Sequence, residues 1–543
     1  MTDGKAELIL RNGRIWRGAG LGVAEALAAA DGVILATGGD DDVDGLAGPD
    51  TKTIDLRGRL AIPGFYDAHM HLLPLGLTLN EIDARPDVAP TIDALIDQVR
   101  RHVADLAPGA WAFGRGYDHH LVAERRHPTR DDLDAAAPDN PVYIKRTCGH
   151  MGVANSAALA LAGIDRGSAE PPGGHIERRD GRPTGLLQER AQQRIFDVMP
   201  PPSSDALVAA VEHGSRLMLA HGITSAMDAG VGMRAGFAEY RAYARARDEG
   251  RLPMRAYLCL VGGPNGIVEQ AYAEGLVTGV GDERLKIGPI KIFTDGSAGG
   301  RTAAMREAYV GDDCDCGMFL FGDDDMNDMV LDYHVKGYQL GVHAIGDAAI
   351  DQTLTAVGRA MAAHPVVDRR HRIEHCGFIH PEQIAEMVRL GMVPVPQPIF
   401  IHQFGDAYVD VLGEERPASA YPMASWIAAG LRPAASTDAP VSDYNPFLNL
   451  YATLTRAAAS GRVIGANQCI GVEAALTAMT YNGAYAGFSE TTRGTLETGK
   501  LADVAVIDTD LLRADPDEIR AAQADLTVLG GELVHDRLGE AGG

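Results

Sequence analysis

The feature that most constrains the fold is an alternation of short apolar runs with helical stretches between residues 60 and 440. This alternation is typical of a parallel β-sheet covered by helices, because the strands of such sheets are buried on both faces and are joined by crossover helices. Eight such units predict a (β/α)8 barrel. The eight runs are Leu60–Asp67, Ile223–Asp228, Met254–Leu260, Lys286–Thr294, Gln339–His343, Arg372–His375, Met392–Gln397 and Arg432–Thr437.

The first two runs lie much further apart than one crossover helix requires. We therefore expect an insertion at residues 74–205 within a barrel of residues 61–489, and we interpret this insertion as a cover on the substrate side. The two chain ends share a different sequence pattern, in which short apolar runs are separated by turns such as Asn12-Gly13 and Gly530-Gly531. Residues 1–60 and 490–543 are accordingly predicted to form one small composite β-sandwich domain.

Composition narrows the class of partner and the compartment. The net charge of −25 argues against nucleic acid and anionic membrane surfaces, which require clustered positive charge. The six cysteines form no CxxC pair, and the sequence shows neither a signal peptide nor a run of apolar residues long enough to span a membrane. We expect a cytoplasmic protein with reduced thiols that acts on a small molecule, and the sequence leaves a homodimer open.

Polar residues gather where the predicted strands end. In a barrel of this kind catalysis takes place at the C-terminal ends of the strands, and two histidines spaced two apart on an extended chain face the same way. Each residue alone has a structural explanation, such as a hydrogen-bonded histidine or a salt-bridged lysine. Their order on separate strands instead indicates a site for a divalent metal such as zinc. The residues are His69, His71, Lys291, His343, His375 and Asp438.

At these residues the sequence resembles the amidohydrolase superfamily, in its branch of N-substituted formamide deformylases and YtcJ-like proteins. The resemblance covers nearly the whole chain and is specific for the branch, but it is a poor guide to substrate. The motifs that carry it are IPGFYDAHMH (62–71), PTRDDLD (128–134), GRPTG (181–185), KIFTDGS (291–297), HAIGD (343–347) and GTLETGKLAD (494–503).

The resemblance implies two metal ions, which we expect to be zinc. His69 and His71 would hold the more buried ion, and His343 and His375 the second. Lys291, carboxylated by carbon dioxide, would bridge them. Asp438 would bind metal and act as general base toward the attacking water, so that a metal-bound hydroxide cleaves a carbon–nitrogen bond of an amide or N-substituted formamide.

The sequence does not decide the reaction or the residues that bind substrate. The superfamily also contains deaminases, decarboxylases, esterases and scaffolds that have lost their metal ligands. We list His150 in the insertion, Arg301 and Gln397 as residues that could bind substrate, although His150 could equally be structural. Residues 117–120 form a polar cluster that we interpret as a solvated loop rather than another metal site.

Overall fold

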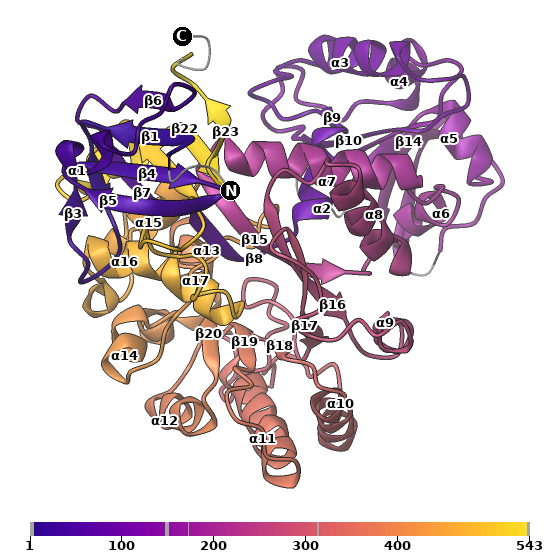
Figure 1. Ribbon diagram of the computed structural model, residues 1–543. Helices are drawn as coiled ribbons and strands as arrows, with labels where there is room; N and C mark the ends of the chain where they lie inside the picture. Colours follow the sequence, from indigo (N-terminus) through magenta and orange to yellow (C-terminus); the bar gives the residue numbers. More distant parts are fainter. Residues whose placement is uncertain (1–4, 147–150, 172, 312–313, 540–543) are drawn as a thin grey trace. The chain divides into compact units, whose positions relative to one another are not determined.

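We describe the fold from a computed structural model of the chain (Figure 1). The structure describes residues 5–146, 151–171, 173–311 and 314–539. The chain forms two compact units. The first joins Met1–Gly76 with Ser204–Gly543, and the second is Leu77–Ser203.

The first unit contains a seven-stranded parallel β-sheet that forms a nearly closed barrel, with helices connecting consecutive strands (Figure 1). The order of the strands in the sheet follows their order in the chain. They are β8 (Phe65–Met70), β15 (Ile223–Val231), β16 (Arg255–Val261), β17 (Leu285–Phe293), β18 (Leu340–Ala344), β19 (Arg372–His375) and β20 (Val393–Val395). The helices between them are α8 (Phe237–Asp248), α9 (Val268–Ala273), α10 (Asp323–Val335), α11 (Asp347–Ala363) and α12 (Pro381–Leu390), and α7 (Ser204–Leu219) precedes β15.

The expected eighth strand at residues 432–437 is not a regular strand, which corrects that prediction. Ala434 and Ser436 donate backbone hydrogen bonds to Pro394 and Pro396 beside β20. On its other side the segment does not form a ladder with β8, because Ala435 N–H bonds to Ala478 O and Tyr66 N–H bonds to Met479 O. The segment reaches β8 only at its end, where the Asp438 amide donates to His69 O at 2.7 Å. The chain around it forms α13 (Ile399–Leu412), α14 (Met423–Ala428), α15 (Pro446–Thr455), α16 (Val472–Ala478) and α17 (Tyr481–Ala486).

The first predicted strand is in fact two strands divided at Gly64. The first, β7 (Leu60–Pro63), belongs to another sheet, and the barrel begins with β8. A Cβ atom on Gly64 would lie only 2.2 Å from Thr224 Oγ1. Only glycine therefore allows the segment at residue 64 to approach β15 so closely.

Strands from both chain ends pair in one six-stranded sheet. A neighbouring four-stranded sheet comes from the N-terminal part alone, and side chains such as Leu10, Ile15, Leu27, Val504 and Leu526 from the two sheets form one buried cluster. The six-stranded sheet has β23 (Glu532–Asp536), β22 (Ala524–Leu529), β21 (Val504–Ile507), β7, β2 (Arg14–Trp16) and β3 (Val23–Ala24). The smaller sheet has β5 (Val33–Gly38), β4 (Ala26–Ala30), β1 (Leu8–Arg11) and β6 (Lys52–Asp55).

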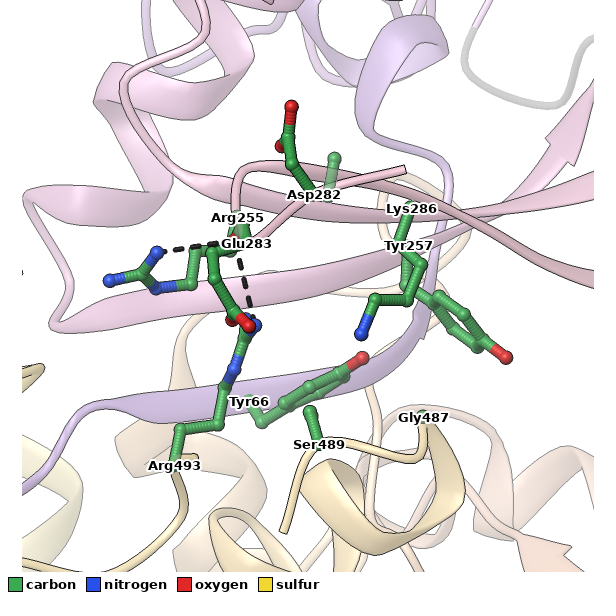
Figure 2. A pocket seen from close by; sticks show the side chains of 10 residues that line it. Tyr66, Arg255, Tyr257, Asp282, Glu283, Lys286, Gly487, Ser489 and Arg493 are labelled. Carbon is green, nitrogen blue, oxygen red and sulfur yellow. Dashed lines mark hydrogen bonds and ion pairs between the residues drawn. The ribbon is translucent and has the colours of Figure 1, made fainter. Parts of the chain in front are cut away.

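A small polar pocket lies at the N-terminal ends of the barrel strands, where Tyr66, Arg255 and Lys286 line it near the starts of β8, β16 and β17 (Figure 2). Its cavity of about 10 Å³ has room for roughly one water molecule. Arg255 forms a buried two-pronged ion pair with Asp503, at 2.6 and 2.8 Å, just before β21. This ion pair attaches the N-terminal end of the barrel to the sheet that contains β21.

The second unit has its own six-stranded sheet and its own buried core. No helix in the described ranges of either unit has the length and apolar character needed to cross a membrane. The strands in sheet order are β13 (Gly174–Arg179), β14 (Arg182–Glu189), β12 (Met151–Ala154), β11 (Val142–Arg146), β10 (Ala112–Tyr117) and β9 (Ile82–Asp83). Its main helices are α3 (Ile92–Ala104), α4 (Arg130–Asp134) and α5 (Ser156–Leu161).

Candidate metal centre

The predicted ligands all belong to the C-terminal ends of the barrel strands, opposite the pocket of Figure 2. His69 is the penultimate residue of β8, and His375 ends β19. Lys291 and His343 lie near the ends of β17 and β18. Asp438 follows the segment that closes the barrel. Parallel strands place their carboxyl ends at one edge, which is where such barrels carry their chemistry.

His69, His375 and Asp438 form the most compact group. One potential ligand atom from each lies within 4.8 Å of the other two, and all three residues are buried. His71 joins them, because its Nε2 lies 3.1 Å from Asp438 Oδ1, while His69 Nε2 lies 3.3 Å from the same oxygen.

Asp438 Oδ1 provides the test of whether a metal fits. This oxygen is buried and accepts no hydrogen bond of good geometry from the residues that the structure describes. A buried carboxylate oxygen that lacks a well-formed hydrogen bond is costly, and two imidazole nitrogens and one carboxylate oxygen are ligands that zinc accepts. The donor set therefore fits a divalent cation at this point.

Asp438 is held as an anion in an unusual backbone conformation. Burial would raise the pKa of its carboxyl group, but the imidazoles of His69 and His71 outweigh this effect and hold that pKa well below its usual range. The backbone φ angles of Asp438 and His375 are 61° and 67°, in the left-handed region. Residues other than glycine keep such angles only where the surroundings enforce them, and such sites cluster at functional positions.

Glu374 orients His69. Its Oε2 lies 2.6 Å from His69 Nδ1, which leaves Nε2 of that ring for Asp438 and a metal. Arg372 donates to both oxygens of Glu374, at 2.8 and 2.9 Å. Burial would raise the pKa of Glu374, but the Arg372 guanidinium and His69 together lower it far below its ordinary value. We assigned Glu374 no role from sequence, although its place directly before His375 was a usable signal.

Gln397 orients His375 in the same manner. Its Oε1 lies 2.7 Å from His375 Nδ1, and its Nε2 donates to Ser436 Oγ and Val395 O. Gln397 is fully buried. Burial, followed by the charge of His343, lowers the pKa of His375 well below its ordinary value, so the ring is neutral with Nε2 available. The structure thus places Gln397 behind a ligand rather than at an open surface where it would contact substrate.

Lys291 lies beside His69 and the ring of Phe293. Its Nζ is 3.4 Å from His69 Nε2 and 4.8 Å from the centre of the Phe293 ring. Only 1% of the residue is exposed, and it forms no ion pair with the carboxylates that the structure describes. Burial lowers the pKa of the Lys291 amine, which favours the neutral form.

His343 lies at the edge of the group. Its ring centre is 4.4 Å from that of His375, but its Nε2 is 3.0 Å from Gly296 O and 3.3 Å from Asp295 Oδ1. Asp295 is buried and accepts hydrogen bonds from three backbone amides, so it fixes the loop that follows β17. Its position in the KIFTDGS motif is the one sequence signal of this anchor.

Arg301, His150 and the polar cluster of residues 117–120 were also singled out from the sequence. Arg301 lies in the loop after β17, with its guanidinium 6.0 Å from the Tyr309 ring centre. His150 lies outside the described residues. In the polar cluster of the second unit, Arg146 donates to His119 Nδ1 at 3.0 Å and to Asp118 at 2.8 Å. The side chains of that cluster are therefore held by hydrogen bonds to one another.

Comparison with known proteins agrees with this arrangement. The model of a protein family described as "Amidohydrolase family" matches residues 52–535. The chain belongs to the amidohydrolase family.

Two relatives and one solved structure are similar to nearly the whole chain. The YtcJ protein of Bacillus subtilis (strain 168) is 30% identical, with 94% of this chain and 96% of that protein covered. An N-substituted formamide deformylase of Arthrobacter pascens is 28% identical, with 95% and 96% covered. The crystal structure of an uncharacterised metal-dependent hydrolase from Pyrococcus furiosus superimposes with a TM-score of 0.78 at 26% identity, covering 93% of this chain and 100% of that one.

The orienting role of Gln397 can be tested by Gln397→Leu. We expect zinc affinity to fall by about 10- to 100-fold, because His375 loses the partner that fixes its ring and tautomer. Gln403→Leu, on an exposed position of α13, is the control and should bind zinc like the unaltered protein. Competition with a fluorescent chelator measures both affinities. Equal affinity in the two variants would remove Gln397 from the site.

Proposed function

We propose that this amidohydrolase-family protein hydrolyses a carbon–nitrogen bond of a small molecule, either an amide or an N-substituted formamide, with the help of divalent metal. The observation that carries the proposal is the convergence of His69, His375 and Asp438 at the C-terminal ends of the strands. The extensive similarity to an N-substituted formamide deformylase supports the choice of bond.

Two ions, most simply zinc, would be held by this chain. His69, His71 and Asp438 would take one ion, and His343 and His375 the other, after the His343 ring leaves Gly296 O. Lys291 lies next to His69, and burial lowers the pKa of its amine, which favours the neutral form that reacts with carbon dioxide. The resulting carbamate would bridge the two ions. The metal, when bound, supplies a water of lowered pKa and polarises the carbonyl oxygen.

Asp438 is the group that would move the proton. Its carboxylate is ionised at neutral pH and can accept the proton of the attacking water. It would then deliver this proton to the nitrogen that leaves as an amine. Glu374 and Gln397 hold the rings of His69 and His375 by their Nδ1 atoms throughout, so that the site needs little rearrangement during the reaction.

The test of this function is Asp438→Asn in zinc-loaded protein. Turnover of N-substituted formamides should fall at least about 10²-fold, because the amide cannot accept the proton, while the four histidines retain much of the zinc. Asp443→Asn, an exposed position five residues along, should keep ordinary turnover. Turnover is followed by the amine released, and zinc by elemental analysis of protein prepared without chelator. Near-normal turnover in Asp438→Asn would exclude it as general base.

The bridging role of Lys291 is tested by Lys291→Ala. We expect most activity and one of about two metal equivalents to be lost, since the bridge between the ions is missing. Propionate should restore part of the activity, because its carboxylate can occupy the position of the carbamate. Lys286→Ala, at the opposite end of the same strand, is the control. Full metal content and turnover in Lys291→Ala would show that the lysine does not bridge metals.

A further inference from the structure

A groove lined by arginines lies on the surface of the second unit. It consists of two adjoining cavities of about 420 and 340 Å³, each within the range of about 300–1,000 Å³ that is usual for small-molecule sites. Arg130, Arg166 and Arg182 line both cavities, and Arg179 lines the larger one. Four arginines therefore share one groove, which we call the arginine groove, in a protein whose net charge is −25.

Two of the motifs singled out from the sequence build this groove. PTRDDLD supplies Arg130, and GRPTG supplies Arg182. Gly185, the last residue of the second motif, has a φ angle of 104°, and a Cβ atom there would lie 2.5 Å from Ala154 O and 2.9 Å from Arg130 N. Glycine therefore lets β14 lie directly against the segment that carries Arg130. The proposed hydrolysis uses neither arginine.

The hairpin of β13 and β14 sets two arginines side by side. Its two-residue turn, Asp180-Gly181, has φ angles of 53° and 74°, as in the type I′ turns that favour this pair of residues. The register places Arg179 directly opposite Arg182. Like charges in this position destabilise a strand pair, so an anion bound beside them would offset their repulsion.

The protein itself compensates little of the positive charge in the groove. Arg130 forms an ion pair at 3.1 Å with Asp131, whose side chain is 80% exposed. Within the part of the chain that the structure describes, the side chains of Arg166, Arg179 and Arg182 have neither a hydrogen-bond nor an ion-pair partner. Their guanidinium groups are thus available to a ligand.

The acidic residues of the groove do not cancel this charge. Asp131 and Asp180 line the larger cavity, against four arginines among its described lining residues. Asp165 lines the smaller one, but its carboxylate accepts hydrogen bonds from Gly167 N and Ser168 Oγ in its own loop, at 2.8 and 3.0 Å. The larger cavity therefore has a surplus of two positive charges, which matches the charge of about −1.5 to −2 on one phosphate group at neutral pH.

The smaller cavity adds an apolar wall beside the arginines. Leu159 on α5, Ile164 after it and Pro183 on β14 line this side. A free inorganic anion would leave the wall uncovered, whereas an apolar group joined to the anion would gain free energy by covering it. Guanidinium groups bind phosphate through paired N–H donors, so the two sides together select a molecule that has both parts.

We propose that the arginine groove binds a small organic phosphate, a molecule in which a phosphate group is joined to an apolar or aromatic part. Arg166 and Arg182 would hold the phosphate, and Leu159 and Ile164 would contact the apolar part. All residues of the groove belong to the second unit and none to the candidate metal centre. The proposal therefore does not depend on the proposed hydrolysis.

Phenyl phosphate is the probe, and isothermal titration calorimetry of full-length, zinc-loaded protein at low ionic strength measures its binding. We expect Arg182→Gln and Arg166→Gln each to weaken binding at least about tenfold, because each removes charge-assisted hydrogen bonds to phosphate. Arg100→Gln, which removes an exposed charge from α3 of the same unit, should bind like the unaltered protein. Phenyl phosphate held at the metal centre would bind equally in all three variants. Equal affinities, or no binding to the unaltered protein, would overturn the proposal.

Two further measurements test the two parts of the ligand separately. Ala160 is exposed on α5 and lines the apolar side, so that Ala160→Trp should fill this side without disturbing the core. It should weaken phenyl phosphate at least about tenfold and leave orthophosphate nearly unchanged. Phenol, which lacks the phosphate, should bind at least about tenfold more weakly than phenyl phosphate. Equal affinities for phenol and phenyl phosphate would refute recognition of the anion, and unaltered binding of phenyl phosphate to Ala160→Trp would refute the apolar contact.

Discussion

The arrangement of the candidate metal centre depends on one buried ionic contact, between Arg372 and Glu374 on β19. Neither residue is more than 1% exposed, and their side chains reach across to β8, where Glu374 holds His69 and Arg372 donates to Ala68 O at 2.7 Å. Breaking such a pair by removing one partner costs about 3–5 kcal/mol, because the other charge stays buried. The same contact therefore links two distant strands of the barrel and sets the direction of the His69 ring, a candidate metal ligand.

The rest of the site builds on that link. The closing segment bonds to β8 through the amide of Asp438, and the side chain of Asp67 accepts from the amide and hydroxyl of Thr437. Burial raises the pKa of Asp67 to about 7, although these hydrogen bonds oppose the rise. The closure that replaces a regular eighth strand thus delivers Asp438 to the imidazoles. At the opposite end, the ion pair of Arg255 with Asp503 attaches the barrel to the β-sheets. This attachment and the candidate metal centre therefore lie at different ends of the barrel.

The sequence predicted the strands better than their connections. Parallel strands buried on both faces appear as continuous apolar runs, and seven of the expected eight lie close to where the runs placed them. The division at Gly64 was not predictable, because β7 pairs with β2 and β21 while β8 pairs with β15, and most of these partners lie far along the chain. The loss of the eighth strand likewise results from a long-range competition, in which Ala478 and Met479 accept hydrogen bonds that a ladder would have used.

For the site, strand-end positions predicted which residues lie at one end of the barrel, and the structure brings His69, His71, His375 and Asp438 together. The sequence could not predict which side chains orient these histidines, since the contact of Glu374 with His69 joins residues 305 positions apart. The pairing of the two chain ends in one sheet, by contrast, is consistent with their shared turn-rich pattern.

The central claim is that the convergence of imidazoles on Asp438 is a metal centre. A zinc-edge anomalous difference map from crystals of zinc-loaded protein tests it most directly. We predict a peak about 2.0–2.2 Å from His69 Nε2, His71 Nε2 and an oxygen of Asp438, with a second peak beside His375. Well-ordered side chains without an anomalous peak near Asp438, in protein loaded with excess zinc, would contradict the account.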